Sequence, residues 1–202
     1  AHRRLAGGRP TAAHLLMRIL LLTHAFNSLT QRLGAELQER GHEISIEFDI
    51  ADSVAEEAVA LFRPQLIVAP YLRRAIPGSI WRNHVCLVVH PGIVGDRGPS
   101  ALDWALQEGE TEWGVTVLQA EAEMDAGPVW ATAEFPLRAA KKSSVYRNEV
   151  TQAATTAVLS AVDKFAAGKR PTSLAAWPDA RGRLRPLMKQ ADRAIDWQRD
   201  DS

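Results

Sequence analysis

The stretch "CLVVHPGIVGDRGPSALDWAL", residues 86–106, contains a complete strand–loop–helix unit. An apolar run ends on a single histidine, His90. A loop rich in Gly, Pro, Asp and Arg follows, and residues 99–109 then have a helical pattern. A short apolar run bounded by turn residues is typical of a strand buried on both faces. The unit therefore predicts a parallel sheet with His90 at the carboxyl end of one strand.

The same alternation of strand and helix patterns precedes this unit. Strands are expected at 18–24, 43–49, 65–71 and 85–90. Between the first two, Leu29, Leu33 and Leu37 recur every four residues, as on one face of a helix. Ser28 and Gln31 have capping-box spacing at its start, and Gly41 is placed to end it; a second helix is expected at 53–62. This order predicts a Rossmann-like, three-layer α/β fold with a mostly parallel sheet and helices on both faces.

The chain divides into three parts of different character. Residues 1–16 are basic and Gly-containing, and they are interpreted as a leader or extension before Met17. Residues 17–168 are expected to form the main domain, with two further strands at 113–121 and 128–137 that could extend the sheet antiparallel and a long helix at 143–167. Residues 169–202 lack periodicity and are expected to wrap around the domain or to link it to a further one.

The overall charge disfavours several classes of partner, although a local patch could still bind them. Lys plus Arg and Asp plus Glu both number 24, so the formal net charge is zero. No global field favours nucleic acid or an anionic membrane. The apolar run "ILLLT" is too short to span a membrane, and a single Cys86 suits a reducing compartment. We expect a soluble cytoplasmic protein.

Common catalytic motifs are missing from the sequence. It has no dinucleotide fingerprint, Walker sequence or G-x-S-x-G elbow, and its six histidines lack metal-ligand spacing, so no metal is expected. What remains is His90 and a carboxylate, Asp125, in the turn "EMDAGPVW". Such a pair at strand ends can move protons and stabilise an oxyanion. A structural histidine and an ordinary turn aspartate remain alternatives. Asp96 and Asp103 are expected to be a loop salt bridge and a charge at a helix N-terminus.

Residues 86–106 together with "GVTVLQAEAEMDAGPVW" (114–130) resemble the formyltransferases that use 10-formyltetrahydrofolate. "VAPYLRR" (68–74) is similar to the segment that lines their folate pocket, and "RPLMKQADRAIDW" (185–197) to their ending. The resemblance implies that His90 and Asp125 are catalytic and that 10-formyltetrahydrofolate is the formyl donor. The folate-binding residues that it implies are Tyr71, Leu72, Arg73, Ile93, Gly95 and Glu123.

Two departures from the family pattern point to one of its branches. Val88 stands where the family has an asparagine, and the loop after His90 is shorter than usual. Both features are similar to the formyltransferases of hydrogenase maturation. That likeness implies transfer of the formyl group to coenzyme A, giving formyl-CoA. It also implies a crotonase-like C-terminal domain, outside this sequence, that releases carbon monoxide for a nickel–iron site.

Other functions stay open. An amine formyltransferase could act on tRNA, a nucleotide or an amino sugar, although the zero net charge speaks against tRNA. Val88 also allows a folate-binding module without catalysis. Arg183 and Arg185 are candidates for binding the phosphates of coenzyme A, because the guanidinium fork bonds two oxygens at once. Their alternative is solvated loop charge, as it is for the second basic cluster at 138–142.

Overall fold

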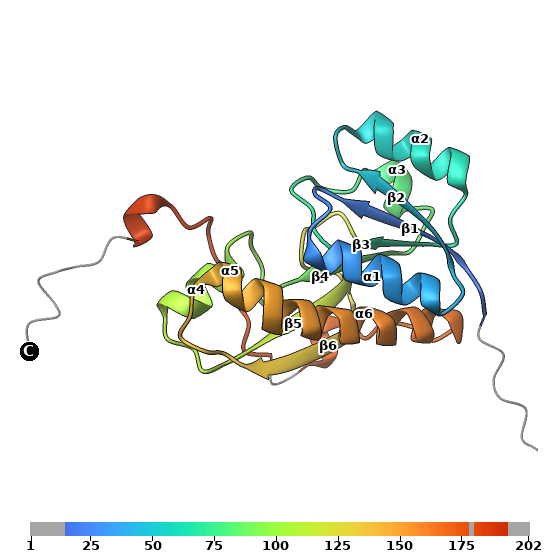
Figure 1. The fold of residues 1–202 in the computed structure, drawn as a ribbon. Helices are drawn as coiled ribbons and strands as arrows, with labels where there is room; N and C mark the ends of the chain where they lie inside the picture. Colours follow the sequence, from blue (N-terminus) through green and yellow to red (C-terminus); the bar gives the residue numbers. More distant parts are fainter. Residues whose placement is uncertain (1–14, 178–179, 194–202) are drawn as a thin grey trace, which may run out of the picture.

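The computed structural model describes residues 15–177 and 180–193 and shows a six-stranded sheet in the order β2-β1-β3-β4-β5-β6 (Figure 1). The strands are β1 (Arg18–Thr23), β2 (Glu43–Phe48), β3 (Leu66–Ala69), β4 (Cys86–His90), β5 (Glu112–Gln119) and β6 (Val129–Pro136). The first four are parallel, and β5 and β6 extend the sheet antiparallel. The predicted mostly parallel α/β sheet is confirmed.

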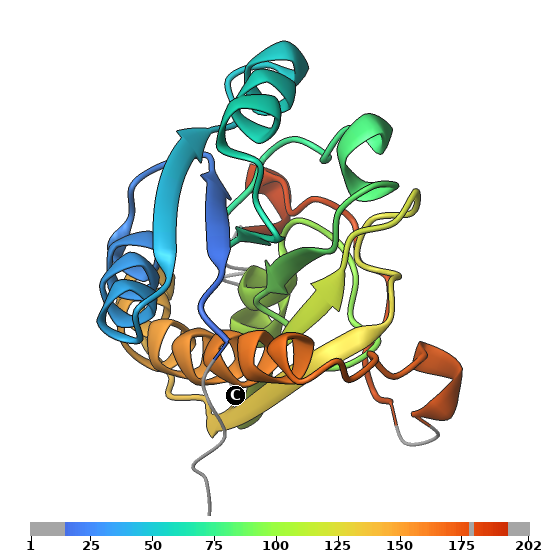
Figure 2. The same cartoon turned by 90° about the vertical axis from the view of Figure 1, so that its right-hand side faces the viewer.

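Helices cover both faces of this sheet (Figure 2). They are α1 (Ser28–Glu39), α2 (Asp52–Phe62), α3 (Gly78–Trp81), α4 (Ala101–Gln107), α5 (Lys142–Val145) and α6 (Thr151–Ala166). Helices α1, α4 and α6 contribute to one core cluster, and α2 and α3 to the other. The short α3 was not expected, and the long helix expected at 143–167 contains a π-helical turn at Tyr146–Val150.

The alternation of side chains in β1 explains why helices pack on both faces of the sheet. Ile19 and Leu21 belong to the core cluster with α1, whereas Leu20 and Leu22 belong to the cluster with α2. All four are at most 1% exposed. Successive residues of a strand point to opposite faces, so an unbroken apolar run needs a layer on each side.

The ends of two helices differ from expectation. The N-cap of α1 is Asn27, whose Oδ1 accepts a hydrogen bond from the Thr30 amide at 3.0 Å, so the capping box expected from Ser28 does not form. Ser100 precedes α4 as expected, but its side chain does not cap the helix. Its Oγ accepts instead from the backbone amide of Met188 at 3.0 Å. The side chain of Ser100 therefore anchors the C-terminal segment and does not cap α4.

This C-terminal segment packs along the loop that follows β4. Three backbone hydrogen bonds join the two segments: Gly182 N–H to Val94 O at 3.1 Å, Arg97 N–H to Arg183 O at 3.1 Å, and Arg185 N–H to Arg97 O at 2.9 Å. Residues 1–14 of the expected leader (1–16) lie outside the described residues. So do residues 178–179 and residues 194–202, which include the end of the motif at 185–197. Within the described ranges, no helix is long and apolar enough to cross a membrane.

Candidate active site

The carboxyl ends of the parallel strands bring several polar side chains to one edge of the sheet. Strand β1 lies between β2 and β3, so the strand order reverses there, and ligands of open α/β sheets bind at such a switch point. His24 follows β1, Asp49 follows β2, Tyr71 comes soon after β3, and His90 ends β4. This edge is therefore where the fold places a site.

His90 lies between two carboxylates. It is 3% exposed, its Nε2 is 2.9 Å from Asp96 Oδ1, and its Nδ1 is 3.6 Å from Asp125 Oδ1. The structure thus brings together the predicted pair, His90 and Asp125. Asp96 was expected to form a loop salt bridge; the residue is 1% exposed, and its partner is His90 itself.

Asp125 is held in an unusual backbone conformation. Its φ of 57° lies in the left-handed region, which aspartate tolerates better than most residues. The amide of Gly98 donates to its Oδ2 at 3.1 Å. Non-glycine residues in this region are enriched at functional sites, where surrounding structure maintains the strain. Both the turn and the neighbouring loop therefore fix the carboxylate beside His90.

Two glycines let the loop after β4 close over this site. A Cβ on Gly92 would lie 2.5 Å from His90 Nε2 and 2.8 Å from Asp96 Oδ1. A Cβ on Gly182, in the C-terminal segment, would lie 1.8 Å from the backbone nitrogen of Asp96. Real Cβ atoms do not approach other atoms so closely, so the geometry of the site requires glycine at both positions.

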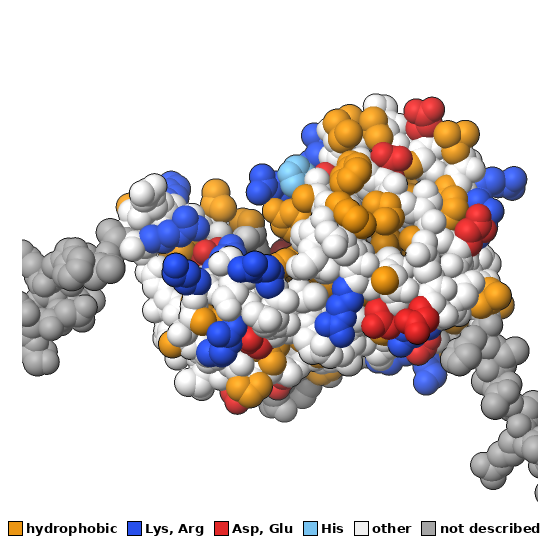
Figure 3. Space-filling model, in the orientation of Figure 1, with side chains coloured by type: hydrophobic (Ala, Val, Ile, Leu, Met, Phe, Trp, Pro, Cys, Tyr) orange, Lys and Arg blue, Asp and Glu red, His pale blue; other side chains and the backbone are white. Residues whose placement is uncertain are grey.

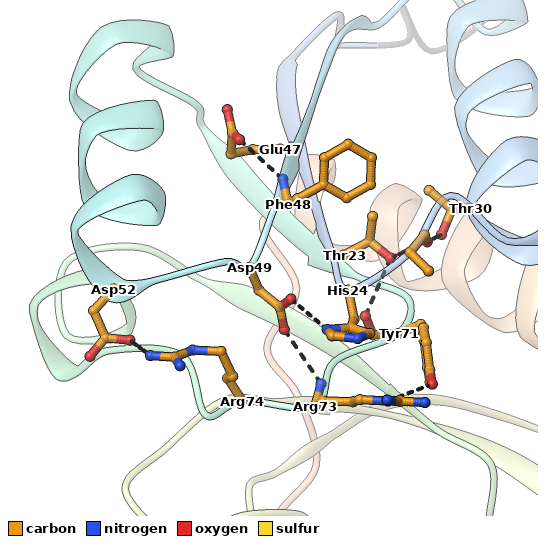
Figure 4. Close-up of polar contacts among 11 residues, drawn as sticks. Thr23, His24, Thr30, Glu47, Phe48, Asp49, Asp52, Tyr71, Arg73 and Arg74 are labelled. Atoms are coloured by element: carbon orange, nitrogen blue, oxygen red, sulfur yellow. Dashed lines mark hydrogen bonds and ion pairs between the residues drawn. The ribbon is translucent and has the colours of Figure 1, made fainter.

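A second polar group lies at the ends of β1, β2 and β3 (Figure 4). His24 Nδ1 is 3.0 Å from Asp49 Oδ1, and the rings of His24 and Tyr71 meet edge to face at 5.8 Å. Arg73 donates from its backbone amide to Asp49 Oδ2 at 3.4 Å and from Nε to Tyr71 Oη at 3.0 Å. The structure thus joins the predicted folate residues Tyr71 and Arg73 to His24 and Asp49. His24 and Asp49 were not among the predicted site residues, although each is the last residue of a predicted strand.

The remaining predicted folate residues lie in different environments. Leu72 packs against the core cluster below α2, and Ile93 is 8% exposed within the other cluster. Gly95 has a φ of 86° and lies against the C-terminal segment. Glu123 is exposed and forms an ion pair with Arg97 at 2.5 Å. Gly95 and Glu123 therefore border the His90 loop, whereas the side chains of Leu72 and Ile93 serve mainly the core.

The two candidate phosphate ligands share one carboxylate. Arg183 Nη2 lies 3.1 Å from Glu108 Oε1, and Arg185 bonds to the same oxygen. The Arg185 side chain is 9% exposed and that of Arg183 is 65% exposed. Figure 3 shows other Lys and Arg side chains gathered over the end of the molecule that carries α4 and α5. There, Lys142 is paired with Asp103 at 2.5 Å.

Cys86 and Val88 on β4 take no part in proton transfer. Burial raises the pKa of the Cys86 thiol to about 12, so the thiol stays protonated at neutral pH and is a poor nucleophile. Val88 is half-buried and packs against the core cluster near α3. Within the described residues, no cluster of three or more His, Cys, Asp or Glu side chains is arranged to hold a metal ion.

Fold and site together define a Rossmann-like α/β protein with a buried histidine between two carboxylates at the carboxyl edge of its sheet. The sequence profile of the family "Formyl transferase" matches residues 35–162, and the chain belongs to this family.

Individual proteins of this family differ in how similar they are to the chain. The chain is 59% identical over 186 residues to the hydrogenase maturation factor HoxX of Bradyrhizobium diazoefficiens, covering 92% of this chain and 33% of that protein. HypX from Aquifex aeolicus in complex with tetrahydrofolic acid superposes with a TM-score of 0.85 at 47% identity, covering 94% of this chain and 33% of that one. A methionyl-tRNA formyltransferase of Roseiflexus castenholzii is 32% identical over 73% of this chain and 48% of that protein. The chain spans about a third of the length of HoxX and HypX.

Proposed function

We propose that this chain transfers the formyl group of 10-formyltetrahydrofolate to the thiol of coenzyme A during hydrogenase maturation. The observation that carries the proposal is the buried His90 beside Asp125 at the sheet edge, in a chain of the formyl transferase family. Its similarity to HoxX and to the tetrahydrofolic acid complex of HypX supports both the pathway and the folate donor.

The two catalytic residues have atoms free to handle a proton. His90 Nδ1 and Asp125 Oδ1 are 3.6 Å apart, which is longer than a hydrogen bond, so reacting groups can compete for both. Nδ1 accepts the proton of the attacking thiol, and the sulfur bonds to the formyl carbon. The protonated ring then donates toward the formyl oxygen as it gains charge.

Collapse of this tetrahedral intermediate completes the transfer. The bond between the formyl carbon and N10 breaks, and the proton taken from the thiol passes through His90 and Asp125 to N10. The products are formyl-CoA and tetrahydrofolate, so atoms and charges balance. In the complete polypeptide, a crotonase-like domain would then split formyl-CoA into carbon monoxide and coenzyme A.

Binding of coenzyme A would involve the C-terminal segment. Arg183 is the more exposed of the two paired arginines, so a phosphate can replace Glu108 there more easily than at Arg185. Titration calorimetry of Arg183→Ala checks this contact: coenzyme A should bind more weakly while folate binding is unchanged. Equal affinities of variant and wild type for coenzyme A would remove Arg183 from the site.

An amine acceptor is the second candidate, because a methionyl-tRNA formyltransferase is among the relatives. A direct assay separates the two. The complete gene product is incubated with 10-formyltetrahydrofolate and either coenzyme A, an amino sugar, an amino nucleotide or charged initiator tRNA. Mass spectrometry should detect formyl-CoA. A formylated amine as the sole product would refute coenzyme A as acceptor, and tight folate binding without transfer to any acceptor would indicate a binding module.

A further inference from the structure

Asp96 is a buried carboxylate to which the proposed reaction assigns no role. Its side chain has no exposed surface, and its Oδ1 lies 2.9 Å from His90 Nε2. Its other oxygen, Oδ2, has no hydrogen-bond partner within the described part of the chain. A buried carboxylate oxygen without a partner costs free energy, so a purely structural role would be served better by a neutral side chain.

The two carboxylates around His90 differ in ways that suggest different tasks. Asp96 is fully buried and within hydrogen-bond distance, whereas Asp125 is 13% exposed and 3.6 Å away. A carboxylate can only accept a hydrogen bond, and a neutral imidazole has a single N–H. The short contact with Asp96 therefore places that hydrogen on Nε2 and leaves the lone pair on Nδ1, facing Asp125.

We propose that Asp96 is a positioning residue that holds the hydrogen of His90 on Nε2 and so presents Nδ1 as the proton acceptor. The inference builds on the proposed formyl transfer, which needs a base on the Asp125 side of the ring. Asp96 acts through His90, as the buried aspartate of a catalytic triad acts through its histidine.

The surrounding backbone holds Asp96 in place. Its amide donates to Ile93 O at 3.0 Å, closing a tight turn directly after β4. Gly182 packs against the same amide, and Gly92 leaves room for the contact between the ring and the carboxylate. Chain segments far apart in sequence therefore converge on one side chain that is not predicted to touch substrate.

The tautomer of His90 can be measured directly. The complete gene product is labelled with nitrogen-15 histidine, and the His90 ring signals are identified by their loss in His90→Gln. The wild type should show hydrogen on Nε2. In Asp96→Asn the side-chain amide can donate to Nε2, so hydrogen should move to Nδ1. A wild-type spectrum with hydrogen only on Nδ1 would overturn the proposal even if the variant does not fold.

Kinetics provide the second readout. A wrong tautomer should lower kcat of Asp96→Asn about 10²- to 10⁴-fold while KM for the folate stays unchanged. Asp103→Asn is the matched control, because Asp103 is a largely buried aspartate on α4 that pairs with Lys142; it should change neither tautomer nor kcat. An unchanged tautomer and unchanged kcat in Asp96→Asn would refute the inference. The spectrum decides independently of activity, so it still tests Asp96 if formyl transfer itself is not found.

Discussion

Gly92→Ala tests whether the contact between His90 and Asp96 matters for catalysis. The new Cβ would lie 2.5 Å from His90 Nε2, whereas ordinary contact begins near 3.4 Å, so ring or loop must move by about 0.9 Å. A misplacement of about 1 Å in a catalytic group costs roughly 100-fold in rate. Overpacking costs about 1–3 kcal/mol of the free energy of unfolding. We therefore expect a folded protein with about 1% of wild-type turnover.

Single-turnover transfer of a carbon-13 formyl group and urea unfolding measure the two effects. Gly109→Ala is the control: its φ is 69° and nothing lies within 4 Å of the new Cβ. The free energy of unfolding of Gly109→Ala should fall by about 1–2 kcal/mol through backbone strain, and its turnover should be unchanged. If Gly92→Ala transfers formyl at the wild-type rate, the contact at Nε2 is not required and the reasoning fails.

Three further predictions concern stability and reactivity. Gly34→Ala in α1 should raise the free energy of unfolding by about 0.5–1 kcal/mol in urea titrations, because alanine favours a helix and the nearest atom is 3.7 Å from the new Cβ. A lower free energy of unfolding would show that the space around Gly34 is too small for a methyl group. Cys86 should resist iodoacetamide at pH 8 in the folded protein, because the pKa of its buried thiol is about 12. The thiol of the unfolded chain ionises at lower pH than that of the folded protein. Above pH 9 the free energy of unfolding of the wild type should therefore fall by up to about 1.4 kcal/mol per pH unit relative to Cys86→Ala. Rapid labelling or parallel pH curves would contradict this. Arg185→Ala should lower the free energy of unfolding in urea by about 1.5–3 kcal/mol, because it removes a buried partner of Glu108. Arg183→Ala should lower it by less than about 1 kcal/mol, because Arg183 is exposed. Equal losses would show that burial does not distinguish the two arginines.

Local patterns were sufficient to predict the sheet and most helices. Leu29, Leu33 and Leu37 are all fully buried, as their spacing indicates, and the apolar runs are the parallel strands. A cap depends on the backbone conformation of one residue, which spacing does not determine. The cap of α1 is therefore Asn27, one residue before the expected Ser28.

The site was only half predictable for the same reason. The proximity of His90 and Asp125 could be predicted because a strand end and a turn are visible in sequence. That of His90 and Asp96 could not, because their contact depends on a loop closed by Gly182, a residue 86 positions further along the chain. The pair formed by His24 and Asp49 likewise requires the order of β1 and β2 in the sheet, which a sequence pattern does not specify.

His90 is proposed to transfer the proton during formyl transfer from folate to coenzyme A. The most direct measurement is the single-turnover rate at which His90→Ala moves a carbon-13 formyl group from N10 to the thiol, with tetrahydrofolate binding measured on the same preparation. We predict a rate at least about 100-fold below wild type with folate affinity retained. A near-normal rate of formyl-CoA formation would show that His90 is not the proton carrier.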